Sequence, residues 1–308
     1  MAIKNIVEFI TELKKIPQDK DYEYFYRGHS DVNFKLIPSI YRQQFIINED
    51  KIFKEIILKT PNDFINEKTT LEKLVKMQHY GLPTRILDIT INPLVALYFA
   101  VKELPKKNGE VIIFKIPKTD IKFYDSDTVS ILANISKRPF EFEIESLNAS
   151  IKEDDGKYLF KDDDGNLYYA GGAPSDCKCV CFDEHEQLVF FNKDVQIAYL
   201  LHEIREEKPY FLSIIRSKDI ERVIAVKVKM NNNRIIKQNG SFLIFGISGS
   251  KANPAKIPTE WILKGIDFEI DAGCKENIAN DLDTLGFNES TLFPELENQA
   301  TYIKQLYK

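Results

Sequence analysis

Five polar side chains that could bind a ligand or take part in acid–base chemistry interrupt a mostly apolar stretch between residues 78 and 100. They belong to His79, Thr84, Arg85, Asp88 and Thr90. A buried arginine or aspartate is costly unless it is paired and hydrogen-bonded. The stretch therefore predicts either an Arg85–Asp88 ion pair that fixes a loop, or a polar ligand pocket.

A loop, a strand and the start of a helix are predicted to position these side chains. Residues 85–90 alternate polar and apolar like a half-buried strand. Asn92 suits the N-cap of a helix over 93–104, and Pro93 suits its first position. Because the N-terminus of a helix favours anions, a pocket at this junction would suit an anionic ligand.

A second polar group ends an aromatic strand predicted over residues 22–28. Arg27 suits bidentate contact with a phosphate, or it pairs with a carboxylate. Tyr26 and Tyr80 either stack on a planar ring or pack in the core. His79 is either a general acid–base group or a hydrogen-bonding residue of a loop.

The composition is that of an ordinary globular protein. The 308 residues are 44% hydrophobic and 29% charged, with a net charge of −5. This charge argues against a broad basic surface for duplex nucleic acid. We expect one domain over residues 1–308, because no linker or repeat divides the chain, and a cytoplasmic location, because no signal peptide or membrane span is evident.

The remaining pattern predicts helices and strands along the whole chain. Helices are expected over 3–15, in two pieces of 45–77 with Asp63 capping the second, and over 193–206, 275–285 and 295–306. Strands are expected over 110–116, 187–191, 222–230, 234–245 and near 266–270. An acidic β-hairpin insertion is expected over 151–172, closed by an Asp-Gly turn.

The cysteines raise the question of a metal site. Cys177, Cys179 and Cys181 alternate, with His185 close behind. Structural zinc sites use cysteine pairs two to four residues apart, which this spacing does not match. We therefore expect these cysteines to be small buried hydrophobes and expect no metal ion.

Three motifs resemble those of the FRG-domain family. They are Tyr26-Arg27-Gly28, the run from His79 to Asp88, and Gln238-x-Gly240-x-Phe242. Residues 204–211 and 291–296 also share that family's general look. The likeness runs from about residue 22 to the C-terminus, apart from the acidic hairpin, and implies a single FRG domain.

The order of these motifs resembles, more weakly, the ADP-ribosyltransferase layout. That resemblance implies an α+β fold: a mixed, mostly antiparallel split sheet flanked by helices, after an N-terminal helical segment. It implies that Arg27 holds an NAD phosphate or ribose and that Gln238 takes the place of a catalytic glutamate. The candidate catalytic residues are then Arg27, His79 and Gln238, and the candidate NAD-binding residues are Tyr26, Gly28, Tyr80, Thr84, Arg85, Asp88 and Thr90.

The third motif departs from that layout, as does Asp88-x-Thr90, which is not Ser-Thr-Ser. Gln238 lacks the negative charge that would stabilise an oxocarbenium-like transition state. Glu184-x-Glu186, ahead of the strand predicted at 187–191, is an alternative third motif, or else a solvated acidic loop.

Taken together, the residues and the resemblance predict an NAD-binding enzyme that passes ADP-ribose to a protein, to a nucleic acid or to water. A bacterial toxin or phage-defence effector is the setting that the resemblance implies. The alternative is a non-catalytic module that binds a nucleotide or a nucleic-acid end. No membrane partner is expected.

Overall fold

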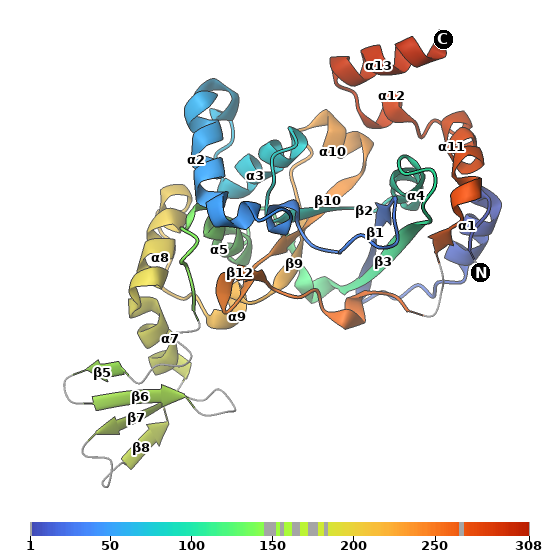
Figure 1. Cartoon of the computed structure of the whole chain (residues 1–308). Coiled ribbons are helices and arrows are strands. Elements are labelled where there is room, and N and C mark those ends of the chain that lie inside the picture. The colour runs from blue at the N-terminus through green and yellow to red at the C-terminus, as the bar shows by residue number, and fades with distance from the viewer. Residues whose placement is uncertain are drawn as a thin grey trace.

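A seven-stranded sheet forms the centre of the protein (Figure 1). The structure, a computed structural model, describes residues 2–144, 152–154, 157–161, 167–171, 178–181, 184–264 and 268–307. In spatial order the strands are β13 (Glu269–Ile270), β3 (Gly109–Pro117), β1 (Tyr22–His29), β2 (Ile86–Thr90), β10 (Gly240–Phe245), β9 (Val223–Lys227) and β4 (Ile121–Phe123). All neighbouring pairs are antiparallel except β4 and β9. The predicted α+β class and mostly antiparallel sheet are confirmed.

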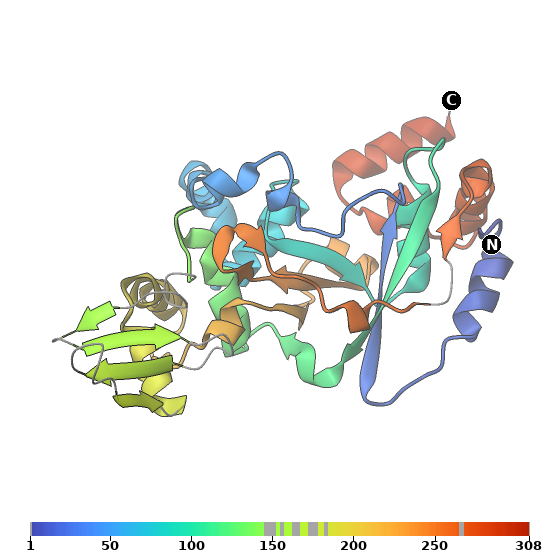
Figure 2. The same cartoon turned by 60° about the horizontal axis from the view of Figure 1, so that its bottom comes forward.

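The sheet is nearly interrupted between β1 and β2. β1 pairs with β3 along its whole length, from Tyr22 to His29. Against β2 it pairs only at Tyr26, opposite Thr90. Figure 2 shows the two strands diverging from this meeting point. One half of the sheet therefore contains β13, β3 and β1, and the other contains β2, β10, β9 and β4.

Two groups of helices cover one face of the sheet, one group on each half. The first packs on β1 and β3 and consists of α1 (Ile6–Lys14), α4 (Pro93–Val101) and α11 (Lys275–Thr284). The second packs on β2, β10 and β9 and includes α2 (Glu49–Lys59), α3 (Thr70–His79), α5 (Asp127–Asn134), α8 (Val195–Glu207) and α9 (Ser217–Ile220). The opposite face carries one continuous apolar cluster, which spans both halves and includes Phe25, Leu243 and Trp261.

Further elements connect or follow these helices and strands. They are α10 (Asn233–Lys237), α12 (Glu289–Leu292), α13 (Leu296–Leu306), the β11 (Ile247–Ser248) and β12 (Ser250–Pro254) pair, and the 3-10 helices η1 (Ser39–Tyr41), η2 (Phe45–Asn48), η3 (Pro61–Phe64), η4 (Lys118–Asp120), η5 (Ile135–Lys137), η6 (Thr259–Trp261) and η7 (Ala272–Cys274). Within the described part of the chain, no helix has the length and apolarity needed to cross a membrane.

A second sheet lies beside α7 (Glu184–Lys193), away from the seven-stranded sheet (Figure 1). It contains β5 (Lys152–Asp154), β6 (Lys157–Lys161), β7 (Leu167–Gly171) and β8 (Lys178–Cys181), in that order. β6 and β7 pair antiparallel within the segment predicted as an acidic hairpin. The predicted Asp-Gly turn lies outside the described residues.

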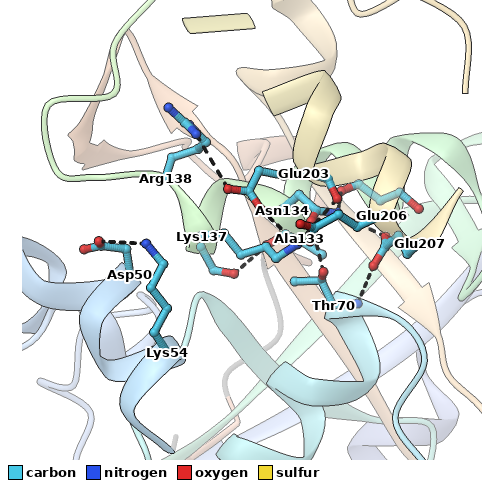
Figure 3. Close-up of polar contacts among 12 residues, drawn as sticks. Asp50, Lys54, Thr70, Ala133, Asn134, Lys137, Arg138, Glu203, Glu206 and Glu207 are labelled. Atoms are coloured by element: carbon cyan, nitrogen blue, oxygen red, sulfur yellow. Dashed lines mark hydrogen bonds and ion pairs between the residues drawn. The ribbon is translucent and has the colours of Figure 1, made fainter. Parts of the chain in front are cut away.

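Polar contacts tie α8 to α3 and α5 (Figure 3). The Glu207 carboxylate accepts the backbone N–H of Thr70 at 2.5 Å and an amide N–H of Asn134 at 3.0 Å. Thr70 is the first residue of α3, where a backbone N–H has no partner within the helix. Lys137 pairs with Glu203 at 3.0 Å and with Glu206 at 2.7 Å. These contacts fix α8, which follows directly on α7.

Three local predictions were wrong. The strand expected at 187–191 is part of helix α7, because a short apolar run fits either period. Residues 233–237 form helix α10, since the Asn232 side chain accepts the backbone N–H of Arg234 as an N-cap. Asp63 lies in η3 and does not cap α3; Thr69 does so, in a capping box with Glu72.

Candidate functional site

A cleft of about 260 Å³ opens where β1 and β2 diverge, between the two groups of helices. Its floor comes from β1, β2 and β10, and its walls come from α3, α4 and α10. Seven of the ten predicted site residues line it: Tyr26, Arg27, Gly28, His79, Asp88, Thr90 and Gln238. Tyr80, Thr84 and Arg85 do not.

Arg27 bridges the gap between the two diverging strands. Its Nη1 donates to the backbone oxygen of Asp88 at 2.6 Å and lies 4.0 Å from the Asp88 carboxylate. A strand that has lost its neighbour leaves backbone carbonyls without partners, and the guanidinium supplies one here. Burial lowers the pKa of Arg27, and the Asp88 charge opposes this. An arginine side chain stays protonated even when burial lowers its pKa, so Arg27 keeps its positive charge in the cleft.

A hydrogen-bonded chain that starts at Thr84 holds Asp88. The buried Thr84 hydroxyl donates to Gln78 Oε1 at 2.5 Å, and Gln78 Nε2 donates to Asp88 Oδ2 at 2.8 Å. This leaves Thr84 behind the cleft wall, while the Asp88 side chain is 57% exposed. Gln78 lines the cleft and was not predicted, although it directly precedes His79.

His79 lies at the end of α3, with a carboxylate from the C-terminal region beside it. Its Nε2 is 3.2 Å from Glu295 Oε1, and Asn232 approaches its Nδ1 at 3.5 Å. Burial, with Arg234 nearby, lowers the pKa of His79. The neutral imidazole therefore donates from Nε2 to Glu295. Tyr80 is largely exposed and packs edge-on against the His79 ring, with centroids 4.8 Å apart.

Gln238 ends α10 and is not in a strand, contrary to its predicted position on the third strand. Its Nε2 donates to the backbone oxygen of Leu292 at 3.0 Å, which ties α10 to α12. Its backbone oxygen accepts the Thr90 hydroxyl at 2.6 Å. The same Thr90 hydroxyl accepts the backbone N–H of Asn92 at 3.0 Å, ahead of α4. Thr90 thus fixes three neighbouring segments at the floor of the cleft.

The glycine of the Tyr26-Arg27-Gly28 motif permits close packing of α4 on β1. A Cβ at Gly28 would lie 1.9 Å from the Ala96 backbone oxygen and 2.6 Å from the Ala100 backbone nitrogen. No side chain fits at these distances. Gly28 lines the cleft through its backbone, and its residue type is explained by this helix–strand contact.

Arg85 is a core residue, and the predicted Arg85–Asp88 pair is wrong. Arg85 is fully buried and forms a bidentate pair with Glu49: Nε donates to Oε1 at 2.9 Å, and Nη2 contacts Oε2. Its Nη1 donates to the backbone oxygen of Phe245 at 3.0 Å. The same Glu49 carboxylate pairs with buried Lys251 at 3.0 Å. Burial alone would lower the pKa of Arg85, but Glu49 and Tyr41 together outweigh burial and raise that pKa.

Arg234, a second arginine in the cleft, was missed. It extends from α10, where its Nη1 donates to the His79 backbone oxygen at 3.2 Å. Its guanidinium carbon lies 4.6 Å from the centre of the Phe293 ring. The strand predicted over 234–245 gave no signal that residue 234 would reach the cleft.

The alternative third motif belongs to a helix. Glu184 and Glu186 lie in α7 and not ahead of a strand, where they were predicted. The possible zinc ligand Cys177 lies outside the described residues. Within the described residues, no group of three or more His, Cys, Asp or Glu side chains could hold a metal ion.

The fold and the cleft define an α+β protein with a polar, arginine-containing cleft at a break in its sheet. The family model of the FRG domain matches residues 22–109 of the chain. The match includes the segment from β1 to the start of β3, and with it Arg27, His79 and Asp88. Arg234 and Gln238, from the opposite wall, lie beyond it. No curated protein and no solved structure matches the chain.

Proposed function

We propose that the cleft binds NAD and that the protein cleaves the bond between nicotinamide and ribose, as an ADP-ribosyltransferase or NAD hydrolase. The observation that carries the proposal is the approach of Arg27 to Asp88 at 4.0 Å, in a cleft that Arg234 also lines. A dinucleotide needs cations for its pyrophosphate, and its reacting ribose needs a carboxylate. The resemblance in motif order points to the same chemistry.

Each of these residues has a distinct role in the proposed reaction. Arg27 and Arg234 bind the pyrophosphate through charge-assisted hydrogen bonds. Asp88 faces the ribose and stabilises the positive charge that develops at C1′ as the glycosidic bond breaks. The bonding electron pair leaves with the nicotinamide nitrogen. C1′ then takes the oxygen of water or of a macromolecular acceptor, whose proton passes to Asp88 or to His79.

This assignment replaces Gln238 by Asp88 as the residue that stabilises the transition state. Among the described residues that line the cleft, Asp88 is the only carboxylate. The Gln238 amide donates to Leu292, so we assign Gln238 to fixing the wall of the cleft. A macromolecular acceptor fits the toxin or defence setting that the resemblance implies.

The size of the cleft is consistent with half of a dinucleotide. Ligand pockets usually measure about 300–1,000 Å³, so 260 Å³ lies just below that range. The nicotinamide ribose would occupy the cleft, next to the apolar side chains of Phe99 and Phe242. The adenosine half would extend out through its mouth.

The second candidate is a non-catalytic module that binds a nucleotide or a nucleic-acid end. It is favoured by the absence of a glutamate among the described residues that line the cleft. Two arginines and several amides are sufficient to hold a phosphate without any reaction. This candidate predicts binding with no release of nicotinamide.

A titration with NAD, with nicotinamide release measured in parallel, distinguishes the two candidates. Arg27→Ala should weaken NAD binding at least about tenfold, the effect of losing one charge-assisted contact. Asp88→Asn should keep NAD bound and slow nicotinamide release by about 10²-fold or more. Arg205→Ala is the matched control, because Arg205 lies on α8, donates to the backbone oxygen of Phe211 and does not line the cleft.

The outcomes separate cleanly. Binding without release in the wild type would establish the non-catalytic candidate. No binding at millimolar NAD would exclude NAD as the ligand, with or without a reaction. The same variants would then be tested for binding to short single-stranded RNA and DNA that carry a terminal phosphate.

A further inference from the structure

A buried histidine stands directly behind Arg27. His29 is 2% exposed and lies two residues along β1, so both side chains are on the same face of the strand. Its partner across the β1–β3 ladder is Glu110. The register of these two strands therefore places a carboxylate, an imidazole and a guanidinium in one line that ends in the cleft.

The hydrogen bonds along this line specify a single tautomer of the histidine. Arg27 Nε lies 3.1 Å from His29 Nε2, and His29 Nδ1 lies 3.0 Å from Glu110 Oε1. Arginine Nε–H can only donate, so His29 Nε2 must accept and carries no proton. The proton is then on Nδ1, where it is donated to Glu110. Glu110 and neutral His29 thus hold the Arg27 guanidinium from behind.

We propose that Glu110 and His29 are positioning residues for Arg27, and that protonation of His29 releases Arg27 and weakens anion binding in the cleft. A proton on Nε2 would set two N–H groups against each other, which breaks the contact with Arg27. The inference deepens the proposed function, because it takes Arg27 as the contact to the pyrophosphate. The ligand class is therefore a diphosphate, either free or within NAD.

The groups that face His29 keep it neutral at physiological pH. Burial lowers its pKa, and the charges of Arg27 on the same strand and of Arg42 in the loop after η1 lower it further. Glu110 on β3 opposes them. The Phe34 ring packs edge-on against the imidazole at 6.0 Å and adds no charge.

The sign of the resulting pH dependence is unusual for an anion site. The pKa of His29 lies below its ordinary value of about 6.5, so the line is intact at pH 7 and is lost as the pH falls through that lowered pKa. Acidification normally strengthens anion binding, because histidines gain charge. Here it should weaken the affinity for pyrophosphate.

The first test reads the tautomer directly. The chain has four histidines, so ¹⁵N-histidine labelling gives a spectrum that single substitutions can assign. Two-bond ¹H–¹⁵N correlations should show His29 as the neutral Nδ1–H form at pH 7. An Nε2–H tautomer, or a charged His29 at that pH, would overturn the proposal.

The second test measures binding of inorganic pyrophosphate and of NAD from pH 7.5 to 5 by calorimetry. His29→Phe removes both hydrogen bonds and should weaken binding about tenfold at pH 7. His29→Gln supplies one amide donor for Glu110 and one amide oxygen for Arg27, and should remain within about threefold of the wild type. Both variants should lose the decline in NAD affinity at acidic pH. NAD is the ligand for this comparison because its diphosphate keeps its charge over the range, whereas inorganic pyrophosphate gains a proton.

Two results would contradict the positioning role. One is an unchanged affinity in His29→Phe when thermal unfolding shows that the variant is folded. The other is an acid-side decline in NAD affinity that persists in both variants. If the wild type binds neither pyrophosphate nor NAD, the proposed function fails. Positioning is then judged from the solvent exchange of the Arg27 Nε–H, which should accelerate in His29→Phe and not in His29→Gln.

Discussion

The buried pair of Arg85 and Glu49 allows a stability prediction with a definite order among variants. Glu49 is 3% exposed and neutralises two fully buried cations, Arg85 and Lys251, so this cluster carries one excess positive charge. Replacing Glu49 by Gln leaves two buried cations without a counter-charge. Replacing Arg85 or Lys251 by Met leaves one cation paired with one carboxylate.

The magnitudes follow from this count of charges. Removing one partner of a buried ion pair costs about 3–5 kcal/mol. We expect Glu49→Gln to lower the free energy of unfolding by about 5 kcal/mol at pH 7, the upper end of that range. Arg85→Met should cost about 3 kcal/mol, because Lys251 still neutralises Glu49 at 3.0 Å.

The stability of Glu49→Gln should also depend on pH, because the variant leaves Lys251 buried without its counter-charge. Burial lowers the pKa of Lys251, and Glu49 opposes this. In Glu49→Gln that opposition is gone, so the folded-state pKa of Lys251 falls further below its unfolded value of about 10.4. Folding then disfavours the protonated lysine. The penalty is complete below the folded-state pKa of the variant and is relieved as the pH rises, so the variant should gain stability relative to the wild type between its own folded-state pKa for Lys251 and that of the wild type, both of which lie below about 10.4.

Urea unfolding, followed by the fluorescence of the single tryptophan, measures these differences. Trp261 is 2% exposed and packs in the apolar cluster on the far face of the sheet, together with Phe245. An Arg85→Met variant as unstable as Glu49→Gln would refute the charge count. A gap between Glu49→Gln and the wild type that does not change with pH would refute the role of Lys251.

Two further predictions concern packing on the sheet. Gly28→Ala should lower the free energy of unfolding in urea by about 3 kcal/mol, because the new Cβ would lie 1.9 Å from the Ala96 backbone oxygen. Gly240→Ala is the control and should lower it by less than about 1 kcal/mol, because the nearest atom is 3.5 Å away. Equal losses in the two variants would contradict the packing argument. Lys275→Met should lower the free energy of unfolding by about 2–4 kcal/mol in the same assay, because it leaves three backbone oxygens without a donor. The buried ammonium donates to the backbone oxygens of Ser30 (2.7 Å), Glu103 (3.0 Å) and Leu104 (3.2 Å). An unchanged free energy of unfolding would mean that water satisfies these carbonyls.

The sequence was most informative where one local rule decided the outcome. Asn92 caps α4 by accepting the backbone N–H of Leu94, as its position before Pro93 predicted. β1 and β3 formed where aromatic and β-branched residues cluster. The run at 187–191 failed, because four consecutive apolar residues have no period that separates strand from helix.

The candidate site was predictable in part, because its two sides come from different ranges of the chain. Arg27, His79 and Asp88 lie within 62 residues and came from motifs that sequence alone made visible. The partner of Arg85 was missed, since Glu49 begins helix α2, far from Arg85 in the sequence, and no sequence spacing relates the two residues. Arg234 was missed for the same reason: only the fold brings α10 to face β1.

The single contact between β1 and β2 also has a mechanical consequence. The helices on one face form two separate clusters, one on each half of the sheet, whereas the apolar cluster on the other face is continuous. The two halves of the sheet could bend relative to each other where Tyr26 meets Thr90, and this would break few backbone hydrogen bonds. The continuous apolar cluster on the other face would then act as the hinge between the halves. The cleft is on the side that widens or narrows with such bending. A ligand that contacts Arg27 on one half and Arg234 on the other would therefore act as a brace, and the protein would be stiffer with the ligand than without it.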